Sequence, residues 1–272
     1  MLKPHCDSDA TNAGGHHEPV LCTRHARLAL LTLVVAVAGC SGAGGQPTPS
    51  QSESDPDRPA IARTVASELP FDEQLAAVRA GTSDAIVLEH TRVTAEELAE
   101  LEGVAGLKWL MLGDVPVADE ALAPLATLTN LERLKLGHCH AGDSGIEHIA
   151  ALKKLLLLNL PHAAFTDEAL ARLVELPELE YLRFGSPHVT DAGMAHVARM
   201  PSLRYLHVID VPITDASLAH VKGMTELHSF YVDGSNLTDD GMSDLVQSRP
   251  DLHFHKDQQH LDRDPRRHDH EH

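Results

Sequence analysis

The chain has 272 residues, enough for one or two ordinary domains with a buried core. Its 40 acidic residues outnumber the 22 Lys and Arg and give a formal net charge of −18. Such an acidic surface repels phosphate backbones. The composition therefore argues against general nucleic-acid binding.

An export signal is predicted at the beginning of the chain. Arg24 and Arg27 precede a short apolar run at 28–38, which as a helix would rise only about 16 Å. That is too short for a hydrocarbon core of about 30 Å. A basic flank, a short apolar stretch and small residues at its end are typical of a secretory signal. We therefore assign residues 1–39 as a signal peptide.

Cys40 follows the apolar run, and the segment VAGC at 37–40 resembles the bacterial lipobox, in which the cysteine is lipidated and becomes the mature N-terminus. The residues after it, up to 60, are rich in Gly, Ser and Pro, a composition typical of a flexible tether. The resemblance implies a lipoprotein anchored to a bacterial membrane through Cys40, facing the periplasm or the cell surface. The alternative is a plain secretory signal followed by a chance cysteine.

Residues 61–82 are predicted to form an N-terminal helical cap around the segment FDEQLAAVR, because repeat arrays need polar ends. Beyond the cap, leucines recur every 24 residues, and each is followed three and five places later by another apolar residue. We number the places of this frame from its first leucine, so that Leu107, Leu110 and Leu112 occupy places one, four and six. The copies begin at Leu107, Leu131, Leu155, Leu179, Leu203 and Leu227, and an earlier degenerate copy carries Ile86 and Leu88. Six registered copies are far beyond chance.

Each repeat is predicted to contain a strand and then a short helix. Alternating apolar residues at places four and six indicate a strand with one buried face. Threonines stand where a helix N-cap is expected, mostly with Asp next, and Thr94 with Glu97 matches a capping box. These threonines are Thr94, Thr166, Thr190, Thr214 and Thr238. Because one unit cannot bury its apolar side alone, stacking should produce a parallel sheet with helices outside.

The units resemble leucine-rich repeats of the T-D-x-G-L kind, as in VTDAGM at 189–194 and LTDDGM at 237–242, which also occur in bacterial envelope lipoproteins. The resemblance covers 83–256. It implies an α/β fold: a right-handed solenoid with a parallel sheet on its concave face and short helices on its convex face. It also implies a binding role without naming a ligand. Leu252 and Phe254 are expected to form a closing strand.

Places three and five of each strand are predicted to point away from the core, onto the concave face. These places hold the only Trp and all three Tyr of the chain, together with Arg and Lys, but no acidic residue. The candidate partner-binding residues are Trp109, Met111, Arg133, Lys135, Tyr181, Arg183, Tyr205, His207 and Tyr231. Aromatic and Arg side chains dominate interface energetics, so we predict an anionic protein or glycan ligand. The alternative is that aromatics merely favour exposed sheet positions.

A metal site is the rival interpretation. Asp114, His138 and His162 share place eight, with His140 close by, and strands about 4.8 Å apart would let them converge on Zn or Fe(II). Residues 257–272 are predicted to be a disordered His-rich tail, which would bind metal weakly or simply aid solubility. Its histidines include His260, His268, His270 and His272.

The sequence favours a non-enzymatic protein without a cofactor. It shows no nucleophile motif, phosphate loop or Cys-His pair with ligand spacing, although a metal-dependent hydrolase at the place-eight residues stays open as the alternative. Cys6, Cys22 and Cys40 belong to the leader or its end. Cys139 is then left alone in the folded part and is expected to point into the core.

Overall fold

The computed structural model describes residues 69–257 and 259–260, which belong to the second of two compact units, Ser50–His272. The predicted signal peptide, the lipidation site at Cys40, the tether and residues 61–68 of the predicted cap lie outside the described residues. So do His268, His270 and His272. Within 69–257 and 259–260, no helix is both long and apolar enough to span a membrane.

A helix closes the first edge of the repeat stack. α1 (Phe71–Arg79) packs its apolar face on the core, and its Gln74 side chain is 5% exposed. The Gln74 amide donates to Val87 O at 3.0 Å, and Gln74 Oε1 accepts from Val87 N at 2.8 Å. These two bonds satisfy backbone groups that an edge strand would otherwise expose. Within the predicted cap, the helix occupies Phe71–Arg79.

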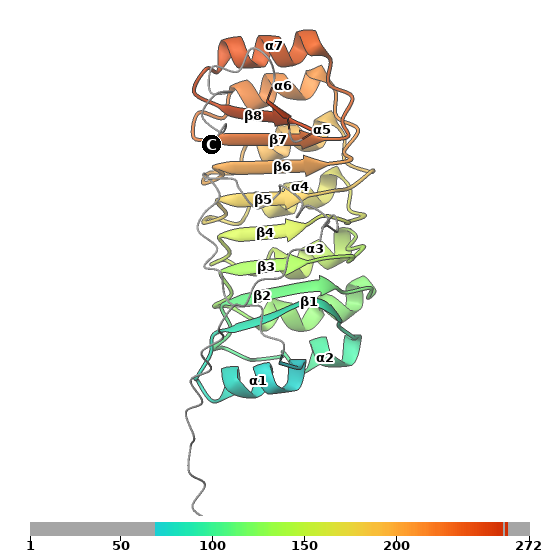
Figure 1. The fold of residues 1–272 in the computed structure, drawn as a ribbon, viewed down its shortest axis with the longest axis vertical. Helices are drawn as coiled ribbons and strands as arrows, with labels where there is room; N and C mark the ends of the chain where they lie inside the picture. Colours follow the sequence, from blue (N-terminus) through green and yellow to red (C-terminus); the bar gives the residue numbers. More distant parts are fainter. Residues whose placement is uncertain (1–68, 258, 261–272) are drawn as a thin grey trace, which may run out of the picture. The chain divides into compact units, whose positions relative to one another are not determined.

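One sheet contains, in chain order, all nine strands of the described residues (Figure 1). The first eight are parallel, and each pairs with the next at a register of one 24-residue repeat, as Leu110 does with Leu134. The parallel strands are β1 (Ala85–Arg92), β2 (Trp109–Asp114), β3 (Arg133–Leu136), β4 (Leu157–Leu160), β5 (Tyr181–Phe184), β6 (Tyr205–Ile209), β7 (Ser229–Asp233) and β8 (His253–Lys256). The predicted parallel sheet is therefore confirmed.

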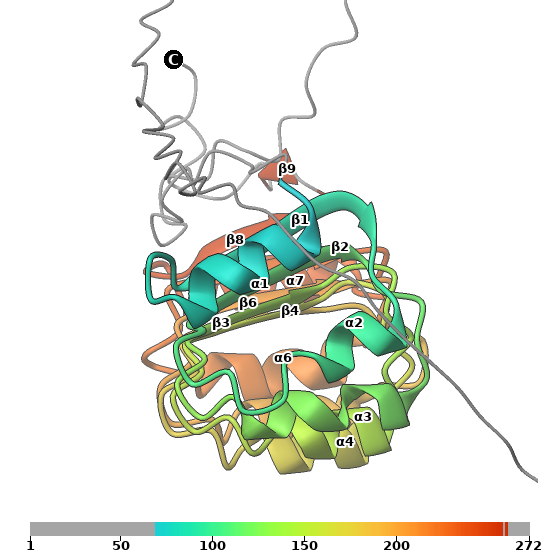
Figure 2. The same cartoon turned by 90° about the horizontal axis from the view of Figure 1, so that it is seen from below.

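Helices connect successive parallel strands, and Figure 2 shows α2, α3, α4 and α6 gathered on one side of the sheet. Their bounds are α2 (Ala95–Ala99), η2 (Asp119–Thr127), α3 (Asp143–Ile149), α4 (Asp167–Leu173), α5 (Asp191–Val197), α6 (Asp215–Lys222) and α7 (Asp239–Ser248). The η2 segment is a 3₁₀ helix that contains Pro124 and begins after Ala118 instead of Thr. A proline inside a helix removes a backbone donor, which accounts for the irregular turn.

The predicted N-caps are confirmed. All five threonines accept a hydrogen bond from a backbone N–H within the first turn of their helix. Thr94 and Glu97 form the complete capping box, with bonds of 3.3 and 2.8 Å. The repeats that lack Thr at this point have Ala118 or Gly142 instead, and neither provides a side-chain cap.

Aspartates at the first position of four helices link neighbouring repeats. Asp215 Oδ1 accepts from Thr238 N at 2.9 Å, and its Oδ2 accepts from Thr238 Oγ1 at 2.6 Å. The same pair of bonds joins Asp143 to Thr166, Asp167 to Thr190 and Asp191 to Thr214. The carboxylate thus contacts the following repeat, whereas the sequence suggested only an interaction with its own helix end.

The core is one continuous cluster, in which the residues at places one, four and six pack against the buried sides of the helices. The inward phenylalanines are at most 1% exposed. They are Phe165, Phe184, Phe230 and Phe254. Cys139 is also fully buried, as predicted, and burial raises the pKa of its thiol to about 11. At neutral pH Cys139 is therefore a protonated core residue and not a nucleophile.

The last edge of the sheet carries an element that the sequence analysis does not place. Two residues of the predicted tail form β9 (Gln259–His260), which pairs antiparallel with β8 through His255 and His260. The sheet therefore continues two residues into the segment that was expected to be disordered.

Candidate binding face

The predicted binding residues lie side by side on the sheet face turned away from the helices, which we call the concave face. Two rows cross the strands, because equal repeats bring equal places into register. The place-three row is Trp109, Arg133, Leu157, Tyr181, Tyr205, Ser229 and His253. The place-five row is Met111, Lys135, Asn159, Arg183, His207, Tyr231 and His255.

All nine candidates are half-buried. Other residues at places three and five are buried, although both places were expected to face outward: Val87, Leu157, Asn159 and Ser229. For Val87 the cause is the Gln74 side chain, which bonds to its backbone from α1. The accessible part of the concave face is therefore narrower than the sequence indicated.

At the N-terminal end of the face, Arg133 stacks on the single tryptophan. The Arg133 Cζ atom lies 4.1 Å from the centre of the Trp109 ring, a cation–π geometry. Arg133 Nη1 is buried and has no hydrogen-bond partner. Burying a charged donor without a partner lowers stability, so this arrangement favours a role other than holding the fold together.

Towards the C-terminal end, a hydrogen-bonded chain runs along the place-five row. Arg183 donates to His207 Nδ1 at 3.2 Å and to Asn159 Oδ1 at 3.4 Å. Because His207 Nδ1 accepts, its Nε2 carries the proton in the neutral ring and donates to Asp233 Oδ2 at 2.8 Å. Tyr231 lies beyond, with its ring centre 5.6 Å from that of His207.

The face is less basic than its row composition indicated. Glu89 and Asp233 stand at place seven, outside the rows, and their carboxylates reach two of the basic side chains. Lys135 Nζ lies 3.8 Å from Glu89 Oε1, and Asp233 holds His207. Charges at places three and five alone do not reveal these neighbours, which stand at place seven.

Two residues of the face were missed altogether. His253 and His255 continue both rows onto β8, beside Ser229 and Tyr231. Their side chains are 2% and 8% exposed, and the ring of His255 stacks on Tyr231 with centres 4.4 Å apart. The signal was present, since each stands 24 residues after a place-three or place-five residue, but the closing strand lacks the leading leucine that marks the frame.

The predicted metal ladder does not converge. The rings of His138 and His162 are stacked, with centres 4.6 Å apart and planes only 8° from parallel. Nitrogen lone pairs lie in the ring plane, so two parallel rings cannot direct theirs at one ion. In addition, His138 Nδ1 lies 3.1 Å from Gly113 O, and His162 Nδ1 accepts from His138 N. Across the described part of the chain, no three His, Cys, Asp or Glu side chains are grouped to hold a metal.

Backbone conformation gives another reason for the residue types at place eight. His138 and Asp210 have φ values of 48° and 51°, and Gly234, at the same place, has 63°. Asp, His and Gly tolerate this left-handed region better than most residues. The pKa of His162 is lowered below its usual range, mainly because the ring is partly desolvated. The neighbouring His138 and His140 lower this pKa further. The His138–His162 stack is therefore a feature of the turn and not a metal site.

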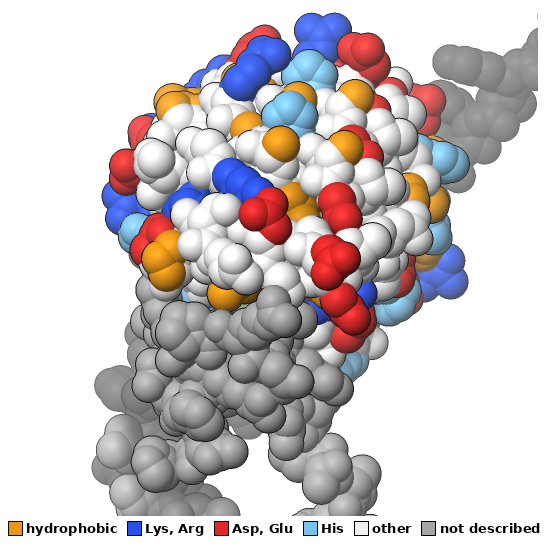
Figure 3. Space-filling view, turned by 90° about the horizontal axis from the view of Figure 1, so that it is seen from above, with side chains coloured by type: hydrophobic (Ala, Val, Ile, Leu, Met, Phe, Trp, Pro, Cys, Tyr) orange, Lys and Arg blue, Asp and Glu red, His pale blue; other side chains and the backbone are white. Residues whose placement is uncertain are grey.

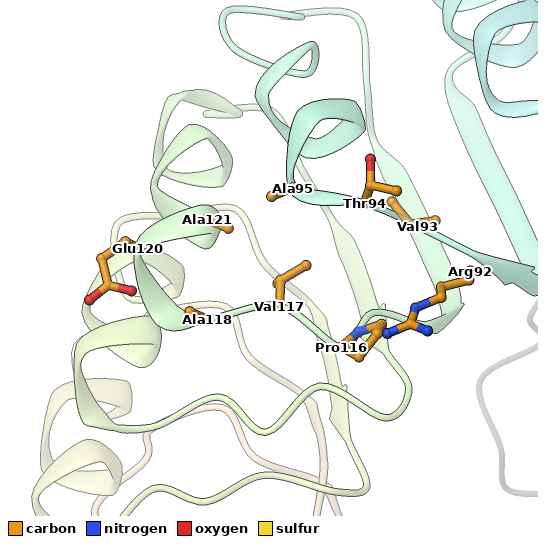
Figure 4. A pocket seen from close by; sticks show the side chains of 9 residues that line it. All are labelled: Arg92, Val93, Thr94, Ala95, Pro116, Val117, Ala118, Glu120 and Ala121. Carbon is orange, nitrogen blue, oxygen red and sulfur yellow. The ribbon is translucent and has the colours of Figure 1, made fainter.

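A hollow lies between the first two repeats, on the helix side of the sheet. Figure 4 shows it open, with Val117 pointing into it, Arg92 reaching towards Pro116 and Glu120 pointing outward. Its remaining lining residues are Val93, Thr94, Ala95, Ala118 and Ala121. The lining holds no nucleophile with an adjacent base, so it does not compete with the concave face as a site for chemistry.

Comparison with known proteins identifies the fold and nothing narrower. No protein-family model and no curated protein sequence matches the chain. Among solved structures, an internalin (InlF) from Listeria monocytogenes superposes with a TM-score of 0.52 at 18% identity, over 66% of this chain and 56% of that one. The plant peptide hormone receptor RGFR1, solved in complex with RGF2, gives a TM-score of 0.44 at 16% identity, over 66% and 28%. The chain thus spans less than two thirds of either structure.

At these identities the similarity concerns architecture alone. Together with the eight parallel strands and the helices that alternate with them, it shows that residues 85–256 form a leucine-rich-repeat solenoid.

Proposed function

We propose that this protein is a non-enzymatic binding scaffold, lipid-anchored through Cys40 in a bacterial cell envelope, which captures a protein ligand on its concave face. The Arg133–Trp109 stack is the observation that carries the proposal. It combines the two residue types that contribute most at interfaces, and one buried guanidinium N–H is unpartnered. A solenoid presents such a row over a long, rigid surface.

The rest of the face supports a partner with acidic and aromatic character. Arg133 stacks on Trp109 and forms no ion pair among the described residues, whereas Lys135 lies 3.8 Å from Glu89 and His207 donates its Nε2–H to Asp233. Tyr181 and Tyr205 continue the row with ring centres 6.2 Å apart. Tyrosines of this kind supply large contact areas with little loss of side-chain entropy.

The described surface offers few competing apolar sites. Leu69 is the one large hydrophobic side chain of residues 69–257 that is exposed. Seen from above, the molecule shows scattered charged side chains with hydrophobic ones between them (Figure 3). Large continuous apolar patches mark interfaces on other proteins, so their absence from this view leaves the mixed polar–aromatic row as the better candidate.

Capture from an envelope extract tests the binding role. The full chain is immobilised, incubated with solubilised cell envelope, and its partners are identified by mass spectrometry. Trp109→Ala and Tyr205→Ala are each expected to weaken capture about 30-fold, the effect of a lost hot spot of about 2 kcal/mol, without lowering thermal stability. Arg172→Ala is the matched control, because Arg172 is exposed on α4.

Capture that is equal for all four proteins would exclude the concave face as the binding surface. If a glycan is recovered instead of a protein, the proposed class of ligand is wrong and the ligand is a glycan.

The anchor is tested separately by Cys40→Ser, which is expected to abolish incorporation of labelled fatty acid and to release the protein from membranes. Unchanged labelling would contradict lipidation at this residue.

A further inference from the structure

The hollow between the first two repeats lies where a repeated link is interrupted. In five successive repeats, an aspartate at the first helix position accepts a hydrogen bond from the backbone N–H of the residue 23 places later. The five aspartates are Asp119, Asp143, Asp167, Asp191 and Asp215. Ala95 stands at the same place in the first repeat and has no carboxylate to offer.

The backbone N–H that the missing aspartate would bind is left unpaired. It belongs to Ala118, and it has no acceptor among the described residues. Ala118 also lacks the hydroxyl that the threonines of later repeats donate to the carboxylate. Both side chains that make the link elsewhere are therefore absent, and a hollow of about 490 Å³ occupies this region. That volume lies in the range of small-molecule sites.

The charge around the hollow suits an anion. Arg92 lines it and forms no ion pair with any described residue, so its positive charge is available to a ligand. The neighbouring acids are engaged or turned away. Glu97 closes its own capping box, Asp119 accepts from the following repeat, and Glu120 points outward (Figure 4).

An apolar side chain is accessible beside this charge. Val117 points into the hollow (Figure 4) and is only half-buried, whereas the residue at the same place in the other repeats is at most 5% exposed. Those residues are Val93, Ala141, Phe165, Val189, Ile213 and Leu237. An aliphatic group placed on Val117 would remove apolar surface from water. The hollow therefore suits a molecule that has both a carboxylate and a short aliphatic part.

We propose that this hollow binds an aliphatic carboxylate, whose charged group takes the position of the missing aspartate. Its oxygen accepts the Ala118 N–H, Arg92 supplies the opposite charge, and its aliphatic part covers Val117. The five internal links show that a carboxylate fits between two helix starts, at 2.7–2.9 Å from the equivalent nitrogen. Hydrogen bonds to an ionised acceptor are stronger than neutral ones. The site lies on the helix side of the sheet and is independent of the partner proposed for the concave face.

Ligand-observed NMR on the full chain measures this binding. The probe isovalerate combines a carboxylate with a branched aliphatic group, and isovaleramide is its uncharged counterpart. We expect saturable binding of isovalerate in the millimolar range, as suits so small a ligand, and binding of isovaleramide about tenfold weaker. A glutamate side chain offers the same chemistry, so acetyl-Ala-Glu-Ala-amide and its Gln counterpart are titrated as well. The tighter of the two carboxylates identifies the source as a free acid or a protein side chain.

Three variants test the contacts one by one. Ala95→Asp supplies the carboxylate from the chain itself, so it should abolish isovalerate binding and raise the Tm by about 3 °C, the effect of one added hydrogen bond. Arg92→Gln removes the positive charge and should weaken binding about tenfold. Ala118→Pro removes the N–H donor and should weaken binding similarly. The φ of −76° at residue 118 suits proline.

Trp109→Ala is the control on the other side of the sheet, and it should bind isovalerate as the unaltered protein does. If Ala118→Pro fails to fold, Ala95→Asp and Arg92→Gln decide. Isovalerate that binds no more tightly than isovaleramide would overturn the proposal. Unchanged binding in Ala95→Asp, or a Tm that does not rise in this variant, would overturn it too. Because none of these outcomes involves capture of a protein by the concave face, failure here is distinguishable from failure of the proposed function.

Discussion

At the scale of single residues, the most consequential polar side chain in the described fold is Arg249, just after α7. It is 8% exposed, and its guanidinium donates to Met224 O at 2.8 Å and to Leu227 O at 3.0 Å. It also bonds to Asp251. The planar fork of Arg matches several acceptors at once, so one side chain satisfies the carbonyls of the turn that follows α6.

Replacing Arg249 should therefore destabilise the fold far more than replacing a surface arginine. We expect Arg249→Met to lower the free energy of unfolding by about 3 kcal/mol, because Leu227 O loses its donor, Met224 O keeps only the donor Leu227 N, and the bond to Asp251 is lost. Arg249→Lys should recover little, since one ammonium cannot reach both acceptors. The control is Arg172→Met, whose partner Glu147 is exposed, with an expected change below about 0.5 kcal/mol. Urea unfolding measures all three, and equal stabilities would refute this role for Arg249.

The sequence did not indicate Arg249, because its partners are backbone carbonyls of the preceding repeat. Backbone acceptors have no signature in a sequence. Inward leucines could be predicted, in contrast, because burial repeats at fixed places and needs no particular partner. The repeat spacing likewise reveals the rows of the concave face, whereas the contacts of Glu89 with Lys135 and of Asp233 with His207 depend on the folded structure.

At the scale of elements, the Asp–Thr pairs join each helix start to the next. A threonine N-cap follows from local propensity, and all five were predicted. The bond from Asp to the following repeat is a contact between residues about 23 apart, which only the stacking creates. A recurrent T-D pair at the repeat spacing was the available signal. The sequence predicted only that each Asp interacts with its own helix, because a negative charge at a helix N-terminus is already favourable.

Asp215 and Asp239 provide a matched test of this link. Both occupy the first position of a helix, but Asp215 bonds to Thr238, whereas no threonine follows Asp239 in the sequence. Asp215→Ala should therefore cost about 1 kcal/mol more than Asp239→Ala at pH 7, as measured by urea unfolding. Equal costs would show that only the helix dipole matters.

The Asp215 link should also depend on pH. The two bonds from Thr238 lower the pKa of the Asp215 carboxyl below its ordinary value of 3.8. A carboxyl whose pKa is lower in the folded state stabilises the fold above the unfolded pKa, and this contribution is lost as pH falls through the folded pKa. The stability difference between the native protein and Asp215→Ala should thus shrink below about pH 4. A difference that persists to pH 2 would contradict the charged link.

At the scale of the whole molecule, the equal spacing of the repeats makes them interchangeable in position. Each repeat contacts only its neighbours, so stability is approximately a sum of repeat and interface terms. The helix side and the sheet side share one 24-residue period: Asp167 bonds to Thr190 just as Asp191 bonds to Thr214, and Leu182 pairs with Leu206 as Leu206 pairs with Phe230.

Removing one whole repeat should therefore leave a folded protein. Deletion of residues 186–209 joins Gly185 to Asp210, places Thr214 opposite Asp167 and sets β5 beside β7. We expect cooperative urea unfolding with a smaller m value, since less surface is exposed on unfolding, and a lower stability because one interface is lost. Deletion of 186–197 removes only half a repeat, so strand residues of one repeat would lie beside helix residues of the next. The circular dichroism spectrum of this variant should therefore differ strongly from that of the native protein. If the two deletions behaved alike, register between equal repeats would not be what holds this solenoid together.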